Sequence, residues 1–89
     1  MPETLERVSF TEEQAKFLSV LDFEEFNNDY FSKSDRFYNI DVCIDDKGYS
    51  IKIWLSDNIK EPAEHYEFTD YDMFAIALKR LVREWEKKR

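Results

Sequence analysis

Two runs of alternating apolar and polar residues stand on either side of a short turn sequence. Every second residue is apolar in residues 38–44 and again in residues 49–55, and residues 45–48 between them end in the one glycine of the chain. A period of two predicts a β-hairpin with one buried and one outer face. Treating residues 45–48 as a four-residue loop fixes the register. The expected cross-strand pairs are Ile44 with Tyr49, Val42 with Ile51, Ile40 with Ile53 and, on the outer face, Asp41 with Lys52.

The sequence on either side of this hairpin has helical spacing. Residues 11–14 (Thr-Glu-Glu-Gln) form a capping box after Phe10 and predict a helix start. Asp22-Phe23-Glu24-Glu25 resembles a second start, and Phe23, Phe26 and Tyr30 follow at helical intervals. Phe23 lies about 240° around a helix from Phe17 of the first segment, so the apolar stripes of the two segments face in different directions. We therefore expect a break near Asp22.

The C-terminal part of the chain predicts a third strand and a long helix. Residues 65–68 read as a strand with Tyr66 and Phe68 facing inward, after a loop over residues 56–62. Residues 69–72 resemble a helix start. The helix that follows has one core stripe, made of Phe74, Leu78, Leu81 and Trp85.

These elements predict one α+β domain over residues 1–89, with residues 1–9 frayed. The expected fold is a three-stranded antiparallel sheet with an N-terminal helix, or a broken helix pair, and a long C-terminal helix packed on one face. Its order is α-(α)-β-β-β-α. At 43% hydrophobic and 17% aromatic residues, the 89-residue chain has the composition of a globular domain.

Charge and cysteine usage narrow the function classes. A net charge of −7 argues against direct nucleic-acid binding. Residues 1–72 carry a net charge of −11 and residues 73–89 a net charge of +4. This uneven distribution is explained either by charges that complement the helix dipole or by a basic tail that contacts an acidic partner. No apolar run is long enough for a membrane span, and residues 1–6 lack the pattern of a signal peptide. Because Cys43 is the one cysteine, we expect a reducing cytoplasm.

The sequence offers no convincing catalytic, metal or cofactor site. His65 is the one histidine and has no second His or a Cys in a ligand pattern, so we expect a half-exposed surface residue. Cys43 is expected on the outer face, where Asp41 and Asp45 raise its pKa and favour an inert thiol. We therefore expect no enzyme, no metal and no cofactor; a hydrolase that uses Cys43 or His65 is a disfavoured alternative.

Two surfaces stand out as partner sites. On the outer face of the hairpin, Phe37 and Trp54 form an aromatic patch with Asn39 opposite Trp54, and this patch is either covered by Phe23, Phe26 and Tyr30 or exposed for a partner. Trp is enriched among interface hot spots, so this patch is the preferred site. On the last helix, Ile76, Arg80 and Arg83 form a smaller docking surface that also suits a homodimer.

The preferred function is a non-enzymatic interaction or regulatory module that binds another protein. The alternative is an acidic mimic of nucleic acid that blocks a DNA- or RNA-binding protein, as some phage-encoded inhibitors of host nucleases do. In this alternative, the number of acidic residues within residues 1–72 matches the ~18 phosphate charges of a DNA duplex as long as the domain. The carriers would be Glu12, Glu13, Glu24, Glu25, Asp29, Asp57, Glu61, Glu64 and Glu67.

Overall fold

The computed structural model describes residues 8–87. Its elements are α1 (Glu12–Val20), β1 (Glu24–Asn27), β2 (Tyr30–Ser34), β3 (Tyr38–Asp45), β4 (Gly48–Leu55), β5 (Glu64–Phe68) and α2 (Tyr71–Lys87). The strands form one antiparallel sheet in the order β1-β2-β3-β4-β5. The predicted α+β class with a helix near each end is confirmed, but the prediction of three strands is wrong. The predicted fraying of residues 1–9 lies mostly outside the described residues.

Helix α1 begins and ends at the predicted places. Thr11 accepts a hydrogen bond from the Gln14 N–H, and the Gln14 side chain accepts one from the Thr11 N–H, so the capping box is confirmed. At the other end Asp22 has φ 71°, and the N–H of Phe23 donates to the Leu18 carbonyl. This is a Schellman ending with an aspartate in the left-handed position. The break expected near Asp22 is therefore real.

The second helix expected after Asp22 is instead the β1–β2 hairpin. Asn27 pairs with Tyr30, so residues 28 and 29 form a turn within the segment that the helical spacing assigned to a helix. All four residues of β1 are exposed, and in β2 the helix-facing positions hold Phe31 and then Lys33. An edge strand without apolar alternation gives no period-two signal, while Phe23, Phe26 and Tyr30 imitate a helical stripe.

The β3–β4 hairpin has the register that the alternation predicts. Ile44 lies opposite Tyr49, and the remaining expected pairs, including Asp41 with Lys52, are all present. Pairing continues to Asp45 and Gly48, so the turn has two residues rather than four. Gly48 has φ 136°, and a Cβ there would lie 2.2 Å from the Phe68 carbonyl oxygen at the end of β5. This turn position therefore requires glycine.

Strand β5 and helix α2 also follow the prediction, with two adjustments. Tyr66 and Phe68 face the helices, as expected, because they pair with Ile51 and Tyr49; Tyr66 nevertheless stays 37% exposed. The α2 cap is Asp70 rather than Thr69, since an Asp70 carboxylate oxygen accepts from the Met73 N–H. The predicted core stripe is confirmed, because its members are all buried: Phe74, Leu78, Leu81 and Trp85.

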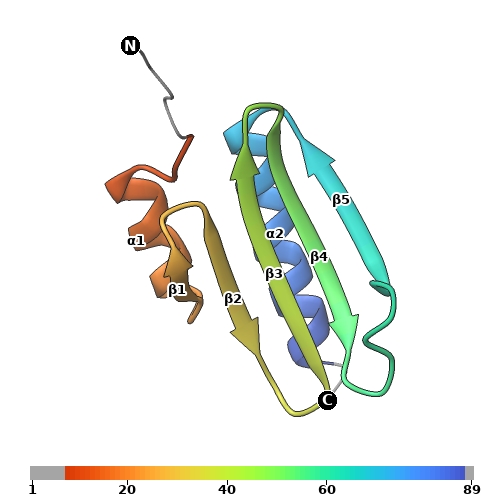
Figure 1. The fold of residues 1–89 in the computed structure, drawn as a ribbon. Coiled ribbons are helices and arrows are strands. Elements are labelled where there is room, and N and C mark those ends of the chain that lie inside the picture. The colour runs from red at the N-terminus through yellow and green to blue at the C-terminus, as the bar shows by residue number, and fades with distance from the viewer. Residues whose placement is uncertain (1–7, 88–89) are drawn as a thin grey trace.

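The hydrophobic core lies between the sheet and the two helices. Figure 1 looks onto the sheet with α2 behind β3 and β4, and with α1 beside β1 and β2. Phe17 of α1 packs edge-on against Tyr71 of α2, and Gln14 of α1 donates to the Tyr49 hydroxyl of β4, so both helices cover the same side of the sheet. We call this side the helix face and the opposite side the outer face.

Candidate functional site

The outer face of the sheet is covered by neither helix. It carries alternate side chains of the strands, and those of β2 to β5 are small or polar over most of the surface. They are Tyr30, Ser32, Ser34, Asn39, Asp41, Cys43, Ser50, Lys52, Trp54, His65 and Glu67. Within residues 8–87 this face has no second layer, so it is open to a docking partner.

A hydrogen-bonded polar network stands in the middle of this face. Asp41 accepts a hydrogen bond from Ser32 at 2.8 Å and another from the Asn39 amide nitrogen, while Ser34 donates to the Asn39 amide oxygen. Ser32 is only 6% exposed, although it lies on the outer face. Ser32 and Asn39 donate to the Asp41 carboxylate directly, and Ser34 is connected to it through Asn39. The network therefore holds these four side chains in fixed positions.

Tyr30 and Cys43 lie beside this carboxylate on the same face. Burial raises the pKa of Tyr30, and the negative charge of Asp41 and a hydrogen bond to it raise it further. Burial is also the main reason that the pKa of Cys43 is raised, followed by the charge of Asp41, while Lys52 acts in the opposite direction. A raised pKa keeps the thiol protonated and weakly nucleophilic. The expected direction for Cys43 is confirmed, but its main cause is burial rather than charge.

The aromatic patch, made of Phe37 and Trp54, lies at one end of the outer face. Asn39 pairs with Trp54, and the Ser56 N–H donates to the Phe37 carbonyl oxygen, which places Phe37, just before β3, diagonally across from Trp54 on β4. Phe37 is 50% exposed. The Trp54 ring is half-buried, and its Nε1 is shielded from solvent without a hydrogen-bond partner among the described residues.

The residues that were considered as a cover for this patch lie elsewhere. Phe23 is buried in the core, and Phe26 packs against Tyr30 with ring centroids 5.5 Å apart. Tyr30 pairs with Cys43, four residues along β3 from the Asn39 position beside Trp54. These three residues therefore do not cover Phe37 and Trp54.

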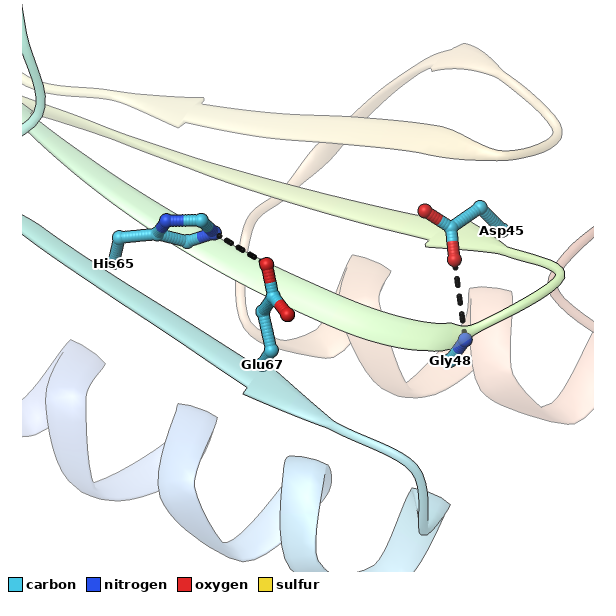
Figure 2. Close-up of polar contacts among 4 residues, drawn as sticks. All are labelled: Asp45, Gly48, His65 and Glu67. Atoms are coloured by element: carbon cyan, nitrogen blue, oxygen red, sulfur yellow. Dashed lines mark hydrogen bonds and ion pairs between the residues drawn. The ribbon is translucent and has the colours of Figure 1, made fainter.

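His65 lies on the outer face of β5, as expected. Its Nε2 is 3.3 Å from a Glu67 carboxylate oxygen, and Figure 2 shows both side chains on the side of β5 away from α2. Figure 2 also shows the Asp45 carboxylate accepting from the Gly48 N–H at the hairpin turn. A shallow groove of about 560 Å³ lies between these two contacts. Within residues 8–87, no three His, Cys, Asp or Glu side chains are grouped to hold a metal ion.

The second predicted surface is a groove along α2. Ile76, Arg80 and Arg83 line it together with Lys79, Glu84 and Lys87, and it encloses about 470 Å³. Ile76 is 60% exposed. The structure therefore brings these three predicted residues together, on the helix layer and away from the aromatic patch.

The acidic residues of the alternative reading are spread over the molecule. Glu12 and Glu13 lie on the first turn of α1, Glu24 and Glu25 on β1, and Glu64 and Glu67 on β5 at the opposite edge of the sheet. Asp29 lies in the β1–β2 turn, and Asp57 and Glu61 lie in the loop between β4 and β5. No single element gathers them into one row.

The polar network is the part of the outer face that sequence reasoning missed. No strand was predicted before residue 38, so the cross-strand position of Ser32 and Ser34 beside Asp41 and Asn39 was missed. The sequence does contain a signal for the β1–β2 hairpin. Residues 28–29 suit a two-residue turn, and after them Tyr30, Ser32 and Ser34 alternate with Phe31 and Lys33.

Comparison of the chain with protein-family models, with curated proteins and with solved structures gives no match. No helix within the described part of the chain is long and apolar enough to cross a membrane.

Proposed function

We propose that this chain is a non-enzymatic protein-binding module whose partner docks on the outer face, with Phe37 and Trp54 as the anchor. The observation that carries the proposal is the half-exposed Phe37 next to the half-buried Trp54, at the end of a sheet face that no described element covers. Aromatic side chains dominate the energetics of protein interfaces and cluster at their hot spots.

The surroundings of the patch suit such an anchor. Asn39 lies beside Trp54 and is held by hydrogen bonds to Ser34 and Asp41. A partner therefore meets a surface whose polar groups are already ordered, and less conformational entropy is lost on binding. Polar groups around an aromatic anchor also fix the orientation in which the partner binds.

The indole nitrogen of Trp54 adds a second argument. Its N–H is shielded and unpaired among the described residues, and leaving such a donor without an acceptor costs about 1–3 kcal/mol. A rotation of the ring that lets this N–H meet an acceptor of the partner recovers that cost. Binding at this place is therefore favoured by both apolar burial and a completed hydrogen bond.

Site-specific photocrosslinking in the native host tests the proposal. A photoreactive phenylalanine analogue at position 37 or 54 should crosslink one protein, and the same analogue at Ile76 serves as the control. Ile76 is as exposed as Phe37 but lies on the helix layer. Crosslinks at Ile76 without any at positions 37 and 54 would contradict the proposal and favour the α2 groove.

Affinity measurements on the captured protein complete the test. Trp54→Ala should weaken binding by roughly 30-fold or more, as expected for a hot-spot aromatic residue. Ile76→Ala should leave the affinity nearly unchanged. A complex that tolerates Trp54→Ala, but dissociates on added salt and on neutralisation of the acidic residues, would favour nucleic-acid mimicry instead.

A further inference from the structure

The two edges of the sheet differ in regularity. Strand β1 has four residues, and its register with β2 shifts between Glu25 and Asn27. Strand β5 pairs with β4 over all five of its residues without a shift, and no described strand pairs with its other side. A bulged, short edge resists further pairing, whereas a regular edge is a template for another strand.

The alternation of backbone groups shows what β5 presents at this free edge. The Ala63 N–H donates to the Ile53 carbonyl oxygen, so Ile53 directs its backbone groups towards β5. Ile53 pairs with Glu64. Alternate residues of an antiparallel strand point to opposite neighbours. Glu64, Tyr66 and Phe68 therefore bond to β4, and His65 and Glu67 direct their N–H and C=O groups outward.

The outward residues of β5 are complementary to themselves. If a second copy pairs antiparallel about a two-fold axis at Tyr66, His65 faces Glu67 of that copy and Glu67 faces its His65. Both side chains lie on the outer face, where they already contact each other at 3.3 Å within one chain (Figure 2). Axes at His65 or at Glu67 would place identical residues opposite each other. A histidine opposite a glutamate provides a polar cross-strand pair, whereas an axis at Glu67 would place two carboxylates opposite each other, which opposes that register.

The helix side of the same axis is suited to burial. Tyr66 is 37% exposed there, and its hydroxyl donates to Glu64 at 2.6 Å. The charge of Glu84 on α2 contributes to the raised pKa of Tyr66, which places Glu84 on the flank of α2 above β5. Met73 shares that flank at helical spacing and is 59% exposed. Tyr and Met are both enriched in protein interfaces.

Helix α2 contacts both β4 and β5. Two sheets joined through β5 about this axis therefore carry their α2 helices on the same side of the continuous sheet.

We propose that two copies of this chain form a homodimer through antiparallel pairing of β5 with β5, about a two-fold axis at Tyr66. The two sheets become one continuous sheet, and their outer faces lie side by side. This dimer is independent of the proposed protein-binding function, since it uses the edge of β5 and not the aromatic patch.

Sedimentation equilibrium of the full chain tests the proposal, with twice the chain mass of 10.8 kDa as the expected species. Glu67→Pro removes an outward N–H without removing a bond to β4, which edge strands tolerate. It should weaken self-association roughly 100-fold, because the loss occurs in both copies. Glu25→Pro is the matched control on the β1 edge and should leave the dimer intact.

Charge exchange tests the register separately from the edge. His65→Glu places two acids opposite each other at both pairs and should weaken the dimer. Adding Glu67→Lys to it restores opposite charges and should restore association, even if the proline variant fails to fold. A chain that stays monomeric up to roughly 1 mM, or a dimer unaffected by both Glu67→Pro and His65→Glu, would overturn the proposal.

Discussion

The two faces of the sheet are held together by different forces. On the helix face, fully buried apolar side chains pack in close ring contacts, and Phe74 alone packs against Phe10, Tyr49, Phe68 and Tyr71. On the outer face, order comes from hydrogen bonds that centre on Asp41, and Phe37 at the end of the face is half-exposed. Burial of apolar area dominates folding free energy. The helix face should therefore set stability, while the outer face is free to serve binding.

The largest expected effect is on the helix face. Phe74→Ala removes a ring with no exposed surface, stacked on Tyr49 at 4.9 Å between centroids. Such truncations cost about 3–5 kcal/mol, which is a large part of the 5–15 kcal/mol of a typical domain. Urea denaturation followed by circular dichroism measures the loss, and the midpoint should fall steeply with an unchanged slope.

The same truncation on the outer face should cost little. Phe37 is half-exposed, and surface substitutions away from special features change stability by about 0.5 kcal/mol or less. Phe37→Ala in the same denaturation experiment is therefore the matched partner of Phe74→Ala. If the two variants were equally destabilised, the assignment of stability to the helix face and of binding to the outer face would be wrong. The aromatic patch would then belong to the core.

An intermediate effect is expected at Asp41, where the outer face does contribute to stability. Asp41→Ala removes the acceptor that the Ser32 hydroxyl and the Asn39 amide nitrogen share, and it leaves Ser32 only its 3.2 Å contact with the Asn39 amide oxygen. Unpaired buried donors cost about 1–3 kcal/mol, so the urea midpoint should fall clearly but less than for Phe74→Ala. Asp41→Asn keeps an acceptor oxygen and should lose less. Equal stability of Asp41→Ala and the unmodified chain would show that the network does not hold this face.

The sequence was most informative where one face is buried and the strand is central. The β3–β4 register could be predicted because a shift by one residue would expose Ile51 and Ile53. The α2 stripe could be predicted because any other orientation of the helix would expose Leu78. The β1–β2 hairpin was missed because burial does not dictate an edge strand: β1 is exposed throughout, and Lys33 occupies a helix-facing position. Lys33 approaches Asp22 at 4.0 Å, a pairing that only the folded chain reveals.

That error carried over to the candidate site. Because Phe26 and Tyr30 were assigned to a helix, the sequence left open whether they cover the aromatic patch. The hairpin takes them to the far end of the outer face, with Tyr30 beside Cys43. The Phe37 and Trp54 positions followed from the β3–β4 register and were correct, whereas the Ser32–Asp41 network required knowledge of β2.

The smallest expected effect concerns the reactivity of Cys43, which reports the electrostatics of the outer face. Burial and the charge of Asp41 raise its pKa, and the thiolate is the reactive form. Alkylation by iodoacetamide near pH 8 should therefore be slower in the folded chain than in urea. Asp41→Asn removes the second cause and should increase the rate in the folded state. Asp45→Asn is the matched control, because Asp45 lies next along the same face but does not contribute to this pKa shift. A rate that rises equally in both variants would point to loosening of the sheet rather than to the charge of Asp41.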